Sequence, residues 1–316
     1  KQDRARMRGN LRGIRIVVVD EASMISHELL NFIKDDAARN NRKYLFIGDH
    51  CQIPPINEMH SPIFDLTESE PLTEIIRQGE GSPIITLATQ IRDVIEGATG
   101  VKLQMNAKSA IGNIVTMDSE QFLEAVYDNG FMDDDNDDRV LAWRNVTIKK
   151  YNAMICDSYD ITDDFVVGLH VVFNEAFIQQ EEIVANNGQE GNVTSVEERT
   201  NSVGLPYYRI GISGMNPTFN VIPNAYHDQY ENYFQSLKAI AITNSSKWLD
   251  YYRAMEEYAD IRPRFACSVH KAQGSTFRDA YIDLLDIQKC RDDITRYRLI
   301  YTAITRATRN VYIRVK

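Results

Sequence analysis

The sequence has 316 residues, which is enough for two ordinary domains and an insertion. Its hydrophobic share of 43% and charged share of 25% are ordinary for a globular protein, and no stretch approaches the roughly 18 consecutive apolar residues of a membrane span. Lys and Arg number 35 against 45 Asp and Glu, so the net charge is −10. Taken alone, this charge argues against a nucleic-acid partner, although it does not exclude a local groove that grips a few nucleotides.

Three further features show which kinds of site and signal the sequence does not predict. The four cysteines stand far apart without a CxxC pair, at Cys51, Cys156, Cys267 and Cys290. This spacing is typical of reduced thiols and predicts neither a disulfide framework nor a zinc site. Residues 1–15 are basic and lack an apolar core, so no secretory signal is expected there. The acidic run 133–138 lacks the spacing and the glycine of a calcium loop, and we interpret it as a solvated turn.

The first part of the chain alternates strands and helices. The apolar run 14–19 predicts a central strand of a parallel sheet, and Ser26 then caps a helix with apolar residues at helical spacing. The run 44–47 predicts the next strand, and Ser82 precedes a proline that opens another helix. This alternation predicts an α/β domain with a parallel sheet.

The pattern restarts and is then interrupted. Ser119 begins a predicted helix, residues 140–143 a strand and residues 148–155 a second helix. From 164 to 263, strand-like pieces alternate with turn signals and are followed by a more helical stretch, which predicts a small β-rich insertion. The strand-like pieces are 166–173, 182–185, 192–196 and 207–212. The strand–helix pattern returns at Phe265 and continues to residue 315.

An apolar strand that ends in Asp20-Glu21 is the usual end of a nucleotide-hydrolysing sheet. Asp20 is suited to hold a magnesium ion through water, and Glu21 to orient and deprotonate an attacking water. Many parallel strands end in acidic residues, so this feature is weak by itself.

The next predicted strand runs into the string Gly-Asp-His-Cys-Gln-Ile-Pro-Pro at residues 48–55. Gly48 allows a tight turn at the carboxyl end of the strand, where ligands bind in open α/β sheets. Gln52 is an uncharged donor and acceptor, suited to sense a γ-phosphate or its attacking water. A plain Asp/Pro turn does not account for the whole string appearing one strand after Asp-Glu.

These strings resemble motifs of superfamily-one helicases. Asp-Glu-Ala-Ser at 20–23, followed by Gly-Asp-x-x-Gln-x-Pro-Pro, is similar to their second and third motifs. Three further matches follow in order: residues 72–78 resemble the motif whose arginine reaches the γ-phosphate, 268–276 the fifth motif, and 301–307 the sixth, whose arginine is the second-domain finger. The match runs from Ile14 to Val315 and points to the RecD/Dda/Pif type, above all to the phage Dda-like branch.

The resemblance implies a fold and its division. We expect two RecA-like parallel-sheet domains, the first truncated, with a small β-barrel inserted in the second. The carboxyl-terminal part of the first domain would occupy residues 1–96, and the second domain 97–163 and 264–316. An SH3-like barrel would occupy residues 164–263.

The resemblance also implies an activity. It predicts an ATP-dependent DNA helicase that moves 5′-to-3′ on single-stranded DNA, with ATP and Mg²⁺ as cofactors. The hydrolysis residues would be Glu21, Gln52, Arg77 and Arg306, with Asp20 on the metal, and Asp20, Gly274 and both arginines on the nucleotide. Contacts to strand phosphates would come from His270, Lys271, Ser275 and Thr276. Implied partners are single-stranded and forked duplex DNA and a single-strand-binding or other replication protein, in the cytoplasm of a bacterium or a phage-infected host.

Two tryptophans are further candidates for contact with bases, because bases stack on aromatic side chains. Trp143 lies in a predicted buried strand, where core packing is favoured over stacking. For Trp248 the sequence favours neither interpretation.

One element of such a motor is missing from the sequence. A P-loop needs Gly-Lys-Ser or Gly-Lys-Thr, and none of the 16 glycines is followed by lysine. In the family this loop precedes the Asp-Glu strand, where only residues 1–13 stand here, so we expect a fragment that is inactive alone. Two alternatives stay open: a non-catalytic nucleic-acid-binding or scaffold protein descended from a helicase, and an RNA helicase of the same superfamily.

Overall fold

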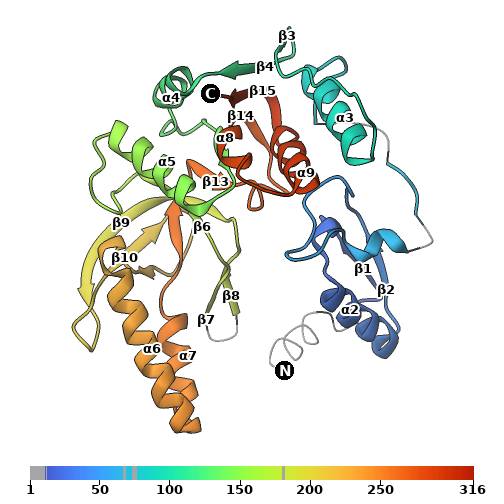
Figure 1. Ribbon diagram of the computed structural model, residues 1–316. Helices are drawn as coiled ribbons and strands as arrows, with labels where there is room; N and C mark the ends of the chain where they lie inside the picture. Colours follow the sequence, from blue (N-terminus) through green and yellow to red (C-terminus); the bar gives the residue numbers. More distant parts are fainter. Residues whose placement is uncertain (1–10, 12, 67–68, 73–76, 180–181) are drawn as a thin grey trace. The chain divides into compact units, whose positions relative to one another are not determined.

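The computed structural model describes residues 11, 13–66, 69–72, 77–179 and 182–316 (Figure 1). The chain divides into two compact units. The first unit comprises the residues up to Asn129 together with Asp137–Lys150 and Ala266–Lys316. The second comprises Gly130–Asn136 and Tyr151–Phe265. No helix within the described ranges has the length and apolar character needed to cross a membrane.

The first unit begins with a two-stranded parallel sheet, β1 (Ile16–Val19) and β2 (Lys43–Phe46). Helix α2 (His27–Asn40) makes the crossover between them, after a 3-10 turn at Ala22–Met24. As predicted, Ser26 caps α2: its hydroxyl accepts a hydrogen bond from the Leu29 N–H at 3.2 Å. The apolar face of α2 packs on a small cluster made by Ala22, Ile25, Leu30, Ile33 and Ile63.

A buried ion pair fixes α2 to the start of β2. The Arg42 guanidinium donates to both carboxylate oxygens of Asp36 at 2.8 and 2.7 Å, and the Tyr44 hydroxyl donates to the same carboxylate at 2.6 Å. Burial alone would raise the pKa of Asp36, but the hydrogen bonds from Tyr44 and Arg42 hold it below its ordinary value. Arg42 also donates to the carbonyl oxygens of Leu11 and Ile14, so one side chain secures the segment that leads into β1.

One face of this small sheet is apolar and exposed in the described part of the chain. The side chains of Ile16, Val18 and Leu45 are 64%, 56% and 56% exposed, and they alternate with partly buried residues along both strands. Parallel sheets are normally covered on both faces. Within the described residues, the sheet is covered only on the α2 side.

The second sheet of this unit has six strands in the order β13-β5-β14-β15-β4-β3. All neighbouring pairs are parallel except the β3–β4 hairpin. Its strands are β3 (Ala107–Ser109), β4 (Gly112–Met117), β5 (Arg139–Ala142), β13 (Ala266–Ser268), β14 (Phe277–Asp283) and β15 (Ala307–Arg314). The accompanying helices are α3 (Pro83–Ile95), α4 (Ser119–Tyr127), α5 (Asn145–Ser158), α8 (Leu284–Ile287) and α9 (Asp293–Ile304) (Figure 1).

The core of this sheet also holds part of the loop that follows β2. Cys51 and Ile53 are buried together with residues of α3, α9 and the central strands. Helix α3 begins after Ser82, whose hydroxyl accepts from the Ile84 N–H at 3.3 Å, as the sequence predicts. The string 48–55 is therefore anchored in a packed core and is not a free surface loop.

The second unit is built on an antiparallel sheet with the order β11-β10-β9-β6-β12. Its strands are β6 (His170–Phe173), β9 (Glu190–Thr200), β10 (Pro206–Ile212), β11 (Phe219–Val221) and β12 (Ile261–Pro263), beside a hairpin of β7 (Phe177–Gln179) and β8 (Glu182–Ala185). A bridge between Asn220 and Tyr258, with the Ala259 N–H donating to the Asn220 oxygen at 2.8 Å, joins β11 to the segment before β12. The sheet thereby closes on itself.

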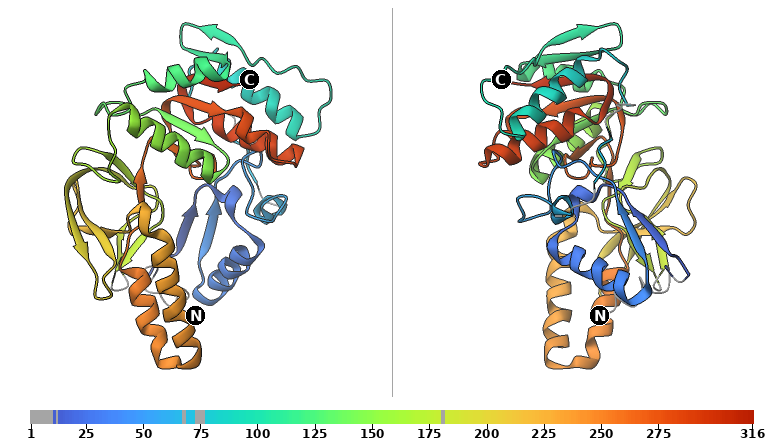
Figure 2. Two further views of the ribbon diagram at one scale, coloured as in Figure 1. Left: turned by 60° about the vertical axis from the view of Figure 1, so that its left-hand side comes forward. Right: turned by 90° about the vertical axis from the view of Figure 1, so that its right-hand side faces the viewer.

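Two helices leave this sheet and return to it. α6 (His227–Thr243) and α7 (Trp248–Glu256) lie side by side as a helical hairpin between β11 and β12 (Figure 2). Short 3-10 turns stand at Pro62–Asp65, Asn224–Tyr226 and Ser245–Lys247.

The predicted fold class is confirmed as mixed α/β with parallel sheets, and several element bounds need correction. The strand predicted at 166–173 forms only from His170, because Gly168 has a φ of 91° and the Leu169 N–H bonds back to the Val166 oxygen in a turn. The strand predicted at 192–196 extends over Glu190–Thr200. The β3–β4 hairpin and α7 were not predicted. The division into domains at residues 96, 163 and 263 stays a prediction.

Candidate active site

Asp20 and Glu21 follow the last residue of β1, and the backbone turns sharply there. Glu21 adopts a left-handed conformation with φ 49° and ψ 39°, which costs a non-glycine residue about 1–2 kcal/mol. Its N–H donates to the Asp20 carboxylate at 2.7 Å, which fixes the Asp20 side chain against the turn. Asp20 is exposed and Glu21 partly exposed, which leaves both carboxylates accessible from the strand end.

Gly48 makes this turn possible from the neighbouring strand. The Ala22 N–H donates to the Ile47 oxygen at 2.9 Å, which brings the two strand ends together. A Cβ atom on Gly48 would lie 2.9 Å from the Ser23 nitrogen and 3.1 Å from the Ala22 nitrogen, both backbone atoms. Gly48 is therefore required by close approach, and it determines where Glu21 stands.

Arg306 lies opposite Glu21. Its side chain is 2% exposed and its Nη1 lies 3.7 Å from the Glu21 Oε1. The guanidinium also donates to the carbonyl oxygens of Thr302 at 3.2 Å and Ser275 at 3.4 Å. Burial, and next the positive charge of Arg77, lower the pKa of Arg306, which still stays charged because its ordinary value is so high.

Gly274 completes this side of the site. It has a φ of 79°, and a Cβ built on it would lie 3.8 Å from the Glu21 Cγ. The backbone of the 268–276 string therefore faces the Glu21 side chain. The predicted catalytic residue Glu21 thus lies beside Gly274 and Arg306, two of the predicted nucleotide-binding residues.

Arg77 and Gln78 contact the backbone at the start of β15, next to Arg306. The Arg77 Nη1 donates to the Thr305 oxygen at 2.9 Å, next to Arg306. The buried Gln78 donates to the Ala307 oxygen at 2.7 Å. Residues 73–76 of the predicted motif lie outside the described residues. Arg77 and Arg306 thus lie near each other, and a bound anion would lower their mutual repulsion.

Several buried polar atoms around this point have no hydrogen-bond partner within the described ranges. They are the Ser23 Oγ, Gln52 Oε1, Gln273 Oε1 and Thr302 Oγ1. Buried polar groups are normally paired, so such a group suggests a ligand or water. All four belong to the strings 20–23, 48–55, 268–276 and 301–307. The two arginines fit the terminal phosphate of a nucleotide, and Asp20 and Glu21 its magnesium ion and attacking water, whereas the two amide oxygens can only accept, as from a water molecule.

Asp49, Tyr301 and Arg92 form a link that the sequence did not indicate. The Tyr301 hydroxyl donates to the Asp49 carboxylate at 2.6 Å, and Arg92 donates to the Tyr301 oxygen at 2.7 Å. Burial, and next the charge of Asp49, raise the pKa of Tyr301, so it remains a hydroxyl donor. This link ties the loop after β2 to helices α3 and α9, which lie 43 and 252 positions away along the chain.

The predicted strand-contact residues lie on the turn that follows β13. Lys271 and Thr276 are exposed, whereas His270 and Ser275 are half-buried. Burial lowers the pKa of His270, which favours a neutral imidazole. The Ser268 hydroxyl accepts from the Lys271 N–H at 3.2 Å and fixes the turn. Their role toward a nucleic acid stays a prediction.

The two tryptophans differ in their surroundings. Trp143 is half-buried and packs against the core of the six-stranded sheet, so the expected core packing is confirmed. Its main-chain N–H donates to the Asp286 carboxylate at 3.0 Å. Trp248 lies on α7 and stacks on Tyr252 with ring centroids 5.7 Å apart. Its ring is already packed on an aromatic neighbour of its own helix.

Two family models match the chain. The model for the UvrD-like helicase C-terminal domain matches residues 263–313, and an AAA domain model matches residues 3–113. The ATP-dependent DNA helicase dda of Enterobacteria phage T4 is 24% identical over 347 residues, covering 96% of this chain and 76% of the phage protein. A protein of Acanthamoeba polyphaga mimivirus, R530, is 22% identical and covers 93% of this chain and 73% of its own length.

These matches support a superfamily-one helicase of the Dda/Pif type.

Solved structures of this type share its fold. The Pif1 helicase from Bacteroides, in complex with ADP-AlF3 and ssDNA, superposes with a TM-score of 0.54 at 14% identity, covering 96% of this chain and 71% of that one. The Pif1 helicase from Candida albicans gives a TM-score of 0.53 at 15% identity, covering 100% of this chain and 74% of that one. The parallel sheets of the first unit are accordingly RecA-like.

The geometry at Gly48 predicts a stability effect. We expect Gly48→Ala to destabilise the protein by about 1–3 kcal/mol, because the added methyl meets backbone that cannot rotate away. Gly79→Ala is the matched control, since its Cβ would lie 3.5 Å from the flexible Ile111 side chain. Urea unfolding of both variants tests this, and equal midpoints for the two would contradict the close approach.

Proposed function

We propose that this protein is the motor part of an ATP-dependent DNA helicase that hydrolyses ATP beside Glu21 and moves along single-stranded DNA. The observation that carries the proposal is the buried Arg306 guanidinium, 3.7 Å from Glu21 and close to Arg77. Two arginines outnumber the one carboxylate of Glu21, so their positive charge is better balanced by a bound phosphoryl group than by Glu21 alone. ATP and Mg²⁺ are the cofactors that this arrangement fits.

Each residue has a role in the proposed hydrolysis. Glu21 accepts the proton of the attacking water, and Gln52 holds that water through its unpaired amide oxygen. Arg77 and Arg306 neutralise the charge that spreads over the transferred phosphoryl group, and an arginine finger contributes about 10³–10⁵ in rate. Asp20 would hold the magnesium ion, which supplies charge neutralisation at the phosphates when bound.

The contacts of Arg306 suggest how hydrolysis reaches the strand. Arg306 donates to the Ser275 oxygen at 3.4 Å, and Ser275 and Thr276 are two of the proposed phosphate contacts. A nucleotide that draws the guanidinium toward its γ-phosphate changes that hydrogen bond. The grip of the 270–276 turn on a DNA backbone would therefore follow the nucleotide state.

DNA is the proposed track because the T4 relative is a DNA helicase and the Bacteroides Pif1 structure holds ssDNA. Another structure of this kind concerns unwinding at forked dsDNA, which makes forked duplex a proposed substrate as well. Single-strand-binding and other replication proteins are the proposed protein partners. A helicase-derived protein that binds nucleic acid without turnover is the main alternative, and an RNA helicase is the second.

Our first functional prediction is that this chain alone does not hydrolyse ATP. The sequence holds no Gly-Lys pair to cradle the β- and γ-phosphates, and the exposed face of β1 and β2 offers a place for a segment that supplies one. Purified chain with magnesium, ATP and single-stranded DNA should release phosphate no faster than buffer does. DNA-stimulated turnover by the chain would contradict the prediction.

The catalytic assignments are tested in a form of the protein that carries a P-loop. Glu21→Gln should abolish turnover and leave ATP and DNA binding nearly intact, because the amide keeps the shape but accepts no proton. Arg306→Ala should slow hydrolysis by about 10³-fold or more without loss of DNA affinity. Near-normal turnover in either variant would show that the role belongs to another residue. DNA binding by the parent protein without any ATP turnover would favour the non-catalytic alternative.

The proposed direction of movement is 5′-to-3′. It rests on the resemblance to the RecD/Dda/Pif type, with a β-rich insertion in the second domain, because the residues of this chain do not by themselves fix which grip tightens. Partial duplexes with one single-stranded tail give the test in the same P-loop-bearing form. Unwinding should require a 5′ tail, and unwinding that requires a 3′ tail would assign the opposite polarity. A matched substrate with an RNA tail distinguishes a DNA helicase from an RNA helicase.

A further inference from the structure

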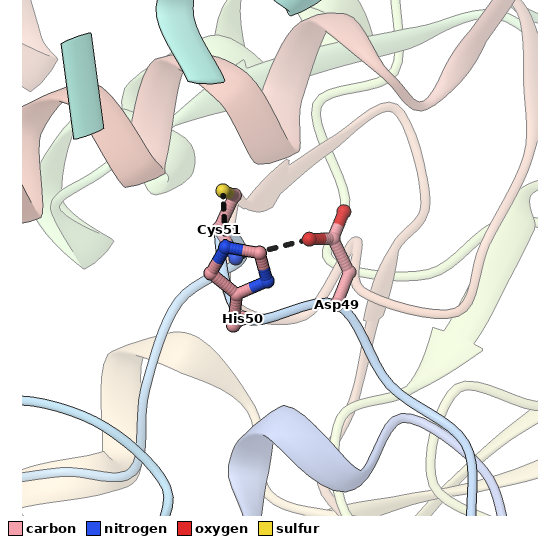
Figure 3. A group of neighbouring side chains, drawn as sticks. All are labelled: Asp49, His50 and Cys51. Carbon is pink, nitrogen blue, oxygen red and sulfur yellow. Dashed lines mark hydrogen bonds between the residues drawn. The ribbon is translucent and has the colours of Figure 1, made fainter. Parts of the chain in front are cut away.

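Three consecutive residues of the loop after β2 gather donor atoms of different kinds. Asp49, His50 and Cys51 each place one possible metal-ligand atom so that all three atoms lie within 4.8 Å of one another (Figure 3). Glu96, at the end of α3, joins them: its Oε1 lies 3.1 Å from the His50 Nε2 and 3.9 Å from the Cys51 Sγ. None of the proposed hydrolysis steps uses His50, Cys51 or Glu96.

The spacing of three of these donors matches the edges of a tetrahedral metal site. The His50 Nε2, Cys51 Sγ and Glu96 Oε1 are separated by 3.1, 3.5 and 3.9 Å. Around a tetrahedral zinc ion, ordinary bond lengths place nitrogen and oxygen ligands about 3.3 Å apart and either of them about 3.6 Å from sulfur. Each separation therefore lies within a few tenths of an ångström of the coordinated arrangement.

Packing around the cluster holds these donors in place. Cys51 is fully buried in the core of the six-stranded sheet, and the backbone of Glu96 is fixed at the helix end by its N–H bond to the Arg92 oxygen at 2.9 Å. The His50 ring meets Phe64 edge-on, with centroids 6.0 Å apart. The His50 and Glu96 side chains are 54% and 47% exposed, which leaves an entry path for an ion from that side.

Asp49 is placed to complete the set. Its Oδ1 accepts from the Cys51 N–H at 3.0 Å, and its Oδ2 from the Tyr301 hydroxyl at 2.6 Å. A carboxylate has lone pairs for a metal and for such donors together, and ligating carboxylates are commonly hydrogen-bonded in this way. A donor atom of Asp49 lies within 4.8 Å of those of His50 and Cys51, so the carboxylate must move toward them to reach a ligand-to-ligand distance.

We propose that Asp49, His50, Cys51 and Glu96 form a binding site for Zn²⁺ or a similar borderline transition-metal ion. One imidazole, one thiolate and two carboxylates are a donor set for such ions, whereas Mg²⁺ prefers oxygen ligands alone. The site is therefore distinct from the magnesium position at Asp20. Sequence spacing did not indicate it, because Glu96 is 46 positions from His50 and only one cysteine takes part.

Binding exchanges a proton for the metal. The Cys51 thiol proton leaves to solvent as the sulfur–metal bond forms, and the neutral His50 keeps its proton on the other ring nitrogen. The ion would then stand between the loop that carries Gln52 and the Asp49–Tyr301 contact to α9. An occupied site would restrain that loop and with it Gln52, the residue proposed to hold the attacking water.

The test uses the purified chain, stripped of metal with a chelator and titrated with Co²⁺ as a spectroscopic probe and then with Zn²⁺. We expect one equivalent of Co²⁺ to bind, with the charge-transfer absorption that a cobalt–thiolate bond gives, and Zn²⁺ to displace it. Cys51→Ala should abolish this absorption. Glu96→Gln and His50→Gln should weaken binding at least about tenfold, the loss that removing even a supporting group of a metal site causes.

Matched controls come from elsewhere in the chain. Cys267→Ser changes a partly buried cysteine outside the cluster, and His60→Gln changes an exposed histidine paired with Asp65, so both should leave Co²⁺ binding unchanged. If Cys51→Ala does not fold, the half-exposed Glu96 still gives a test. Absence of stoichiometric uptake, or uptake that all cluster variants retain, would overturn the proposal. Neither result depends on ATP turnover, so failure here leaves the proposed helicase function untouched.

Discussion

The buried guanidinium of Arg306 is the constraint on which the first unit depends. Removing a charge from water costs several kcal/mol unless opposite charge and hydrogen bonds replace the lost hydration. Arg306 is 2% exposed, yet its nearest carboxylate, Glu21, is 3.7 Å away, and a second cation, Arg77, lies near it. Two backbone carbonyl oxygens supply part of the compensation. With the exposed Arg77 beside the buried Arg306, two positive charges face the one carboxylate of Glu21, so the site gains from an anion.

The elements around Arg306 are organised to hold that charge in place. α9 brings Thr302 under the guanidinium, the turn after β13 brings Ser275, and the sharp turn after β1 brings Glu21. Each contact comes from a different motif string, so none of the strings makes the site alone. The Asp49–Tyr301–Arg92 link attaches α9 to the loop after β2 and to α3. A movement of one motif string therefore changes its contacts with the others.

The sequence predicted those parts of the fold that local physics specifies. Apolar runs located β1, β2 and β5, and serine caps located the starts of α2 and α3, because both signals act within a few residues. Motif order located Glu21, Gly274 and Arg306, and the structure brings these three together. The strand-contact residues and the domain bounds stay predictions.

What the sequence did not predict rests on contacts between distant positions. Tyr301 meets Asp49 across 252 positions and Glu96 meets His50 across 46, and no local pattern encodes either pairing. The left-handed Gly168 shortened β6 although the residues before it favour a strand. Helix α7 was missed because its aromatic residues pack on one another along the helix and leave no long apolar face toward a core.

In the described part of the chain one face of β1 and β2 is uncovered, which has a consequence for how the chain behaves in solution. Ile16, Val18 and Leu45 form a row of exposed apolar side chains on paired strands, the kind of surface through which proteins self-associate. Two molecules that bury this face against each other gain apolar contact without pairing charges, so added salt would not disperse them. Whatever covers the face competes with that association. The solubility of the chain therefore indicates whether this apolar face of the small sheet is buried.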